Sequence, residues 1–173
     1  MDITLRYNLQ SQNDELLKKV NDVLNGIGMN SHVEDGRVFA EKEYLRLYLN
    51  EDPDKYFFPQ IKEDCHRIFE AIKSDFVLTG VIDTSFSAGE YMDFRFSKKG
   101  EQLIVESSDW YIETCMETYK NYEDFCENFF DCTEAEYEKF KNSEFVNILE
   151  TENGEILSDT VPFVKKEIIG WNK

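Results

Sequence analysis

Residues 76–106 read FVLTGVIDTSFSAGEYMDFRFSKKGEQLIVE, and they predict three strands joined by short connections. The strands are expected at 76–83, around 92–96 and at 102–106. In the second strand apolar and polar residues alternate with the period of a half-buried strand. The connection Ser97-Lys98-Lys99-Gly100 carries a glycine where a hairpin loop makes use of a positive φ. The stretch therefore predicts an antiparallel meander.

The chain before this meander combines a strand with a helix. Apolar residues occupy every second position from 3 to 9, which predicts a strand with one buried face. Ser11 is then expected to cap a helix whose apolar stripe ends near Gly26 and Gly28. Strand and helix together predict a layer of helix on sheet.

A second strand and helix are expected between residues 34 and 73. After a polar turn at 34–36, alternating leucines predict a strand at 44–49. Asp52-Pro53 is typical of a helix start, and Pro59 is expected to interrupt that helix before it continues to about Lys73.

The part after the meander predicts two helices and a closing hairpin. Residues 112–131 place aromatic and cysteine side chains at helical spacing, and 133–136 form a capping box for a short helix to about Asn142. Asn153-Gly154 predicts a hairpin turn, and 161–171 a last edge strand. We expect one α+β domain over 1–173, a mainly antiparallel sheet of about five to seven strands with about three to four helices.

Negative charge is concentrated in one part of the chain. The net charge is −17, and residues 101–160 hold 17 acidic side chains against only Lys120, Lys139 and Lys141. Like charges at this density repel one another and destabilise the compact state. A cationic partner would compensate that cost, whereas direct binding to nucleic acid is not expected because phosphates would be repelled.

The expected helix at 112–131 places five of its six acids on one side, within roughly 80° around the axis, and aromatic residues lie just before it in the sequence. These five are Glu113, Glu117, Asp124, Glu127 and Asp131. Acids beside exposed aromatics combine charge steering with anchoring contacts. An acidic helix side also occurs as a plain solvated surface. The candidate partner-binding residues are Glu106, Asp109, Trp110, Tyr111, Glu113, Glu117, Glu123, Asp124, Glu127 and Asp131.

No motif in the chain predicts a cofactor, a metal or a catalytic residue. The four cysteines lack zinc-site spacing and are interpreted as small buried hydrophobes in a reducing compartment. The run at 50–54 departs from a calcium loop, and neither a phosphate-binding loop nor a nucleophile elbow is present. With no signal peptide and no apolar run of about 18 residues, we expect a cytoplasmic protein that is not inserted in a membrane.

Small size, strong negative charge and the acids and aromatics of 106–131 resemble the immunity proteins of bacterial toxin systems, such as polymorphic toxins and contact-dependent inhibition. The resemblance implies a non-catalytic protein that neutralises a cognate basic toxin domain, for example a nuclease, by forming a tight complex. Alternatives are a DNA mimic that inhibits a nucleic-acid-binding enzyme, a small carboxylate-dependent enzyme, or an adaptor. The oligomeric state is left open.

Overall fold

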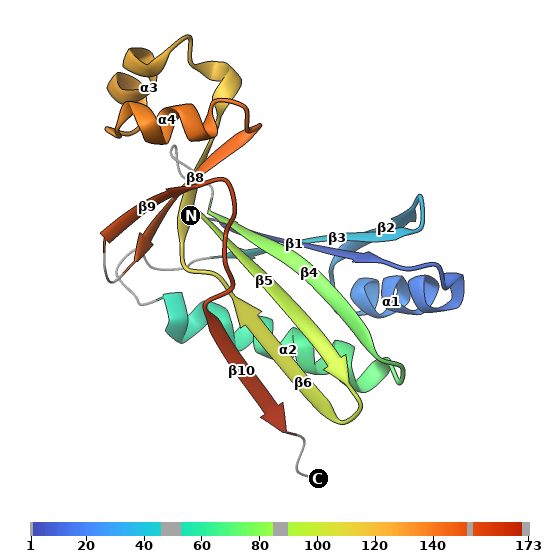
Figure 1. The fold of residues 1–173 in the computed structure, drawn as a ribbon. Helices are drawn as coiled ribbons and strands as arrows, with labels where there is room; N and C mark the ends of the chain where they lie inside the picture. Colours follow the sequence, from blue (N-terminus) through green and yellow to red (C-terminus); the bar gives the residue numbers. More distant parts are fainter. Residues whose placement is uncertain (1, 46–52, 85–89, 152–153, 171–173) are drawn as a thin grey trace.

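The structure is a computed structural model, and it describes residues 2–45, 53–84, 90–151 and 154–170. Within these residues one mostly antiparallel sheet of ten strands is combined with four α-helices and a short 3-10 helix (Figure 1). The strands are β1 (Asp2–Gln10), β2 (Asn30–Glu34), β3 (Arg37–Leu45), β4 (Phe76–Thr84), β5 (Glu90–Lys99), β6 (Gln102–Ser107), β7 (Tyr111–Cys115), β8 (Phe145–Thr151), β9 (Gly154–Ser158) and β10 (Lys165–Gly170). The helices are α1 (Asp14–Gly26), α2 (Pro53–Ala71), η1 (Met116–Thr118), α3 (Tyr122–Asn128) and α4 (Glu134–Phe140).

The sheet runs in the order β2-β3-β1-β4-β5-β7-β8-β9, and β6 with β10 branches from it. The branch arises at β5, whose residues 94–99 pair with β6 while Glu90 and Tyr91 pair with β7. The expected meander is confirmed as β4, β5 and β6, and the expected α+β class is confirmed with more strands than expected.

The main core lies between one face of the sheet and the helices α1 and α2, which lie behind the sheet in Figure 1. Alternate residues of β1, β4 and β5 point into this core, so that Leu5, Leu78 and Phe96 are fully buried. The opposite face of these strands carries no helix of the described chain (Figure 1).

A buried lysine fastens α2 to the sheet. The Lys98 ammonium donates hydrogen bonds to the carbonyl oxygens of Phe69 and Ile72, at 2.9 and 2.5 Å, and lies over the Phe69 ring. Helices end with unpaired carbonyl groups, and a cation there both satisfies them and opposes the helix dipole. Desolvation lowers the pKa of Lys98.

Several expected elements need correction. Asn13, not Ser11, caps α1, because the Asn13 side chain accepts the backbone N–H of Leu16 at 3.1 Å. The interruption expected at Pro59 is wrong, because α2 is continuous from Pro53 to Ala71. Pro59 keeps a φ that suits an α-helix but cannot donate the backbone hydrogen bond of an interior residue. The strand expected at 44–49 begins much earlier, as β3, and residues 46–49 lie outside the described residues.

The long helix expected at 112–131 is wrong. The chain instead forms β7, η1 and then α3, whose first turn is capped by the side chain of Asn121. Residues 111–115 pair with β8 over five positions, and tyrosine, isoleucine and threonine there favour a strand. The aromatic spacing reflects packing in a compact unit around Phe125, not one continuous helix.

The remaining C-terminal expectations are largely confirmed. The capping box at Thr133 and Glu136 opens α4, and β8 and β9 form the expected hairpin, although Asn153 of its turn lies outside the described residues. The last strand, β10, pairs with β6 at the edge of the sheet and begins at Lys165.

Candidate functional site

Five of the eight candidate acids lie on a small helical lobe, which we define as residues 116–144. The lobe contains η1, α3 and α4 and projects from the end of β7 and β8 (Figure 1). Its core is aromatic, since Phe125 is fully buried and contacts the rings of Tyr119, Phe129 and Tyr137. The lobe therefore uses its aromatic residues to fold.

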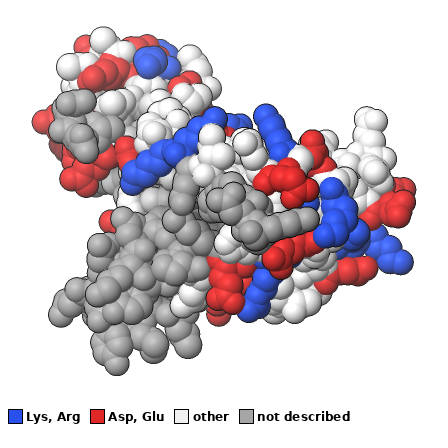
Figure 2. All heavy atoms as spheres, turned by 90° about the horizontal axis from the view of Figure 1, so that it is seen from below, with Lys and Arg blue, Asp and Glu red and all other residues white. Residues whose placement is uncertain are grey.

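Four candidate acids on the lobe are exposed and form no hydrogen bond or ion pair with another described residue. They are Glu117 on η1, Glu123 and Glu127 on α3, and Asp131 after α3. Because they arise from a 3-10 helix, a short α-helix and a loop, they form no single ridge. Figure 2 shows acidic and basic side chains interspersed over the described part of the face seen there.

Asp124, the fifth candidate acid on the lobe, has a structural role. Its carboxylate accepts the backbone N–H of Lys120 at 2.9 Å and the side-chain amide of Asn128 at 2.9 Å. Its own backbone N–H is donated to the Asn121 cap. Asp124 thus holds the start of α3 to the preceding turn, and its substitution would disturb the fold together with any interface.

The other five candidates lie on or beside the sheet; four of them are engaged with neighbours, and Glu113 on β7 is exposed. Glu106 on β6 pairs with the Arg95 guanidinium of β5 at 2.7 Å, and Asp109 lies 3.5 Å from the Lys165 ammonium of β10. Trp110 is partly buried against the main core. These contacts join the connector between β6 and β7 to the rest of the sheet.

Tyr111 is 6 % exposed, and its hydroxyl donates a hydrogen bond of 2.7 Å to the carboxylate of Asp93 on β5. The connector is fixed to the same residue, because the Asp93 amide donates to the Ser108 hydroxyl and the Ser108 amide donates to the Asp93 carbonyl. In this arrangement Tyr111 acts as a fastening between β5 and β7.

Asp93 on β5 is a partly buried carboxyl group that sequence reasoning did not single out, and its charge acts on the candidate Glu113 of β7. Burial raises the pKa of Asp93, which the Tyr111 hydrogen bond opposes. Desolvation, and then the charge of Asp93, raise the pKa of Glu113, while burial raises that of Tyr111. The signal in the sequence was an aspartate within an apolar strand, and its partners became visible only once β7 was placed beside β5.

The lobe also holds two neighbouring thiols. All four cysteines are free; Cys126 donates a 3.6 Å hydrogen bond to the Cys132 carbonyl, and burial raises the pKa of the Cys132 thiol to about 11. A thiol of raised pKa is a poor nucleophile and a poor metal ligand. Among the residues that the structure describes, no group of three or more His, Cys, Asp or Glu side chains is arranged to hold a metal ion.

No helix within the described ranges is both long and apolar enough to cross a membrane. Comparison with protein-family models, with curated proteins and with solved structures finds no match to this chain. The function must therefore be argued from the surface itself.

Proposed function

We propose that this protein is a non-catalytic binding protein that neutralises a basic protein, a cognate toxin domain such as a nuclease, through the acidic surface of the helical lobe. The observation that carries the proposal is the set of exposed carboxylates at Glu117, Glu123, Glu127 and Asp131, which form no ion pair with another described residue.

The charge balance of the lobe supports a cationic partner. Residues 116–144 contain nine acidic side chains and three lysines. One of these lysines, Lys141, is already paired with Glu138. The remaining repulsion costs stability in the free protein and is relieved when a basic surface covers the lobe. A group of uncompensated charges therefore favours binding over isolation.

Inhibition would occur by occlusion. The lobe projects from the sheet (Figure 1), so a partner can approach it from several directions without meeting α1 or α2. Charge attraction between the lobe and a basic cleft would speed encounter, with association rate constants of about 10⁸–10⁹ M⁻¹s⁻¹ at low salt. A nuclease whose cleft is covered in this way cannot bind its nucleic acid.

The test compares two variants that lose the same charge. The lobe variant carries Glu117→Gln, Glu123→Gln, Glu127→Gln and Asp131→Asn. The control variant carries Glu15→Gln, Asp22→Asn, Glu43→Gln and Glu70→Gln, all at exposed positions outside the lobe. Each protein is used to capture partners from a lysate of its source at low salt, and the captured proteins are eluted with a salt gradient and identified.

We expect the wild type and the control variant to retain one basic protein in stoichiometric amount, and the lobe variant to lose it. The purified pair should then show an association rate that falls with salt and is at least about tenfold slower for the lobe variant. Equal capture by both variants would remove the lobe from the interface. Release of many DNA-binding proteins at modest salt would instead favour a DNA mimic.

A further inference from the structure

The face of the sheet opposite α1 and α2 carries a row of side chains, three of them apolar and one a serine, that crosses four strands. Val77 on β4 lies opposite Ser97 on β5, Ser97 opposite Ile104 on β6, and Ile104 opposite Ile168 on β10. Residues opposite each other on neighbouring strands point to the same side. Val77 is 47 % and Ile168 57 % exposed, so the two ends of the row are presented to solvent, while Ile104 is partly buried and Ser97 is buried.

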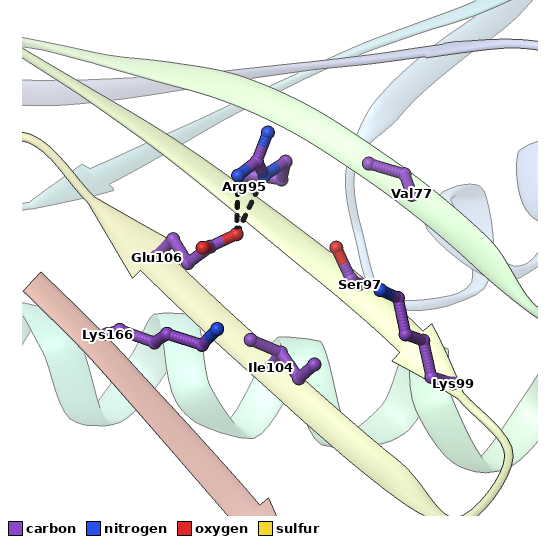
Figure 3. Close-up of a pocket in the computed structure, with 7 residues that line it drawn as sticks. All are labelled: Val77, Arg95, Ser97, Lys99, Ile104, Glu106 and Lys166. Carbon is purple, nitrogen blue, oxygen red and sulfur yellow. Dashed lines mark hydrogen bonds and ion pairs between the residues drawn. The ribbon is translucent and has the colours of Figure 1, made fainter. Parts of the chain in front are cut away.

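Cationic side chains flank this row on both sides. On β5, Arg95 lies two residues before Ser97 and Lys99 lies two residues after it. Arg95 is opposite Glu106 of β6, which in turn is opposite Lys166 of β10. Val77, Ser97 and Ile104 form the floor of a hollow of about 310 Å³, and these four charged residues complete its lining. In Figure 3 the ammonium groups of Lys99 and Lys166 are turned inward, toward Ser97 and Ile104.

The hollow holds an excess of positive charge in a chain whose net charge is −17. Glu106 neutralises Arg95, whose guanidinium also lies 4.8 Å from the ring centre of Phe163. Lys99 and Lys166 form no ion pair with another described residue. Two unpaired ammonium groups beside exposed valine and isoleucine match a ligand that is both anionic and apolar.

We infer that this face is a second interaction surface, which binds an extended acidic segment of a protein partner with one apolar residue between two acidic ones. The spacing supports this occupant. Lys99 is opposite Gln102 of β6 and Lys166 is opposite Glu106, so the two lysines are offset along the strands by four residues, about 13 Å at the rise of a strand. The row that contains Ile104 lies midway between them. An extended peptide places residues i, i+2 and i+4 on one face over the same length.

This surface is separate from the lobe and of opposite charge, so the inference goes beyond the proposed function and does not depend on it. It assigns the protein two faces, one for a basic partner and one for an acidic segment. A protein that inhibits one molecule can in this way be held or recruited by another.

The probe is the blocked heptapeptide TETLTET, titrated at low salt into the isotopically labelled full chain and followed by amide chemical shifts. The peptides TQTLTQT and TETSTET remove the charges or the apolar residue, and adipate supplies two carboxylates on a flexible aliphatic linker without a peptide. The site variant is Lys99→Glu with Lys166→Glu, and the matched control is Lys18→Glu with Lys73→Glu, two exposed lysines outside the hollow.

We expect TETLTET to shift the amide signals of β5, β6 and β10. Its affinity should fall by about tenfold or more in the site variant and change by less than about twofold in the control variant. Both altered peptides should bind more weakly, and neutralising the lobe should leave the titration unchanged. Absent shifts, equal losses in both lysine variants, or equal binding of TQTLTQT would overturn the inference. Adipate binding as tightly as TETLTET would also overturn it, in favour of a small dianion site.

Discussion

Two parts of the molecule differ in how their charges are paired and in the size of their cores. One is the scaffold, built from β1–β6, α1 and α2, and the other is the helical lobe. In the first part, Arg6 pairs with Glu41 and Asp83 across strands, Lys42 reaches Asp64 of α2 at 2.6 Å, and Arg95 pairs with Glu106. In the lobe, Glu138 pairs with Lys141, whereas the exposed carboxylates of Glu117, Glu123, Glu127 and Asp131 form no ion pair with another described residue. Paired charges suit a self-sufficient scaffold, and unpaired ones suit a surface that is completed by a partner.

The two cores differ in the same sense. Among the described residues, 21 buried side chains form the core under α1 and α2, whereas four of the lobe and Val146 of β8 form the smaller core around Phe125. Stability differs locally in proteins, and elements with few buried contacts open first. We therefore expect the lobe to open more readily than the sheet, and to gain most when a partner binds.

The largest test of this difference is Phe125→Ala. Phe125 is fully buried at the centre of the lobe, and removing a buried phenylalanine typically costs about 3–5 kcal/mol. Because the main core is separate, we expect hydrogen exchange to become fast in residues 116–144 while β1, β4 and α1 remain protected. Hydrogen exchange read by mass spectrometry checks this region by region.

Phe125→Leu is the control, since it keeps most of the buried volume and should lose much less protection. Equal loss of protection in the sheet would contradict the comparison, because the lobe and the sheet would then unfold as one cooperative unit. In that case the small core of the lobe would contribute to the stability of the whole chain.

The main core is tested by Gly80→Ala. On β4 the ring of Phe94 and the backbone of β1 approach Gly80 so closely that an added Cβ would lie 2.2 Å from Phe94 Cζ and 2.6 Å from the Arg6 carbonyl oxygen. Overpacking of this kind costs about 1–3 kcal/mol, and we expect the upper end because one neighbour is backbone. Urea unfolding should show the loss, and hydrogen exchange should place it in the sheet.

Gly26→Ala provides the comparison, because nothing lies within 4 Å of an added Cβ at the end of α1. We expect this variant to be as stable as the wild type or more stable by up to about 1 kcal/mol. If both alanine variants behaved alike, the close packing of Phe94 over Gly80 would not limit the core.

The same division explains which parts of the fold the sequence could predict. The meander β4–β5–β6, the strand β1 and the capping box of α4 follow from local patterns, because one face or one turn decides each of them. In β2, by contrast, the residues are largely exposed, so it shows no apolar alternation to detect. The strand β7 is fixed by its pairing with β8, 30 to 38 residues later in the chain. Its aromatic and cysteine residues happen to be spaced as in an amphipathic helix, so the local pattern predicted a helix.

The candidate surfaces follow this pattern as well. Acidity at 117–131 is a property of composition and could be read directly, but which acids are free depends on caps such as Asp124 and pairs such as Glu106 with Arg95. The row from Val77 to Ile168 joins residues far apart in the chain, so it required the strand registers. Tyr111, expected at an interface, is instead a contact between β5 and β7.

That contact offers the smallest and most specific test, which concerns the junction of the two parts. Burial raises the pKa of Asp93 in the folded protein above the ordinary value of 3.8. Between 3.8 and the folded pKa, the folded state therefore binds more protons than the unfolded chain, so the free energy of unfolding falls as pH rises through this window. Asp93→Asn removes this dependence while its amide oxygen still accepts the Tyr111 hydroxyl.

We expect Asp93→Asn to be at least as stable as the wild type at pH 7, with a change below about 1.5 kcal/mol, and to show a flatter pH profile in urea unfolding. Tyr111→Phe should steepen the profile, because it removes the hydrogen bond that opposes the rise of the Asp93 pKa. A large loss of stability in Asp93→Asn at pH 7 would mean that the ionised carboxylate itself holds β7 against β5. The junction between scaffold and lobe would then depend on charge, and acid would loosen it.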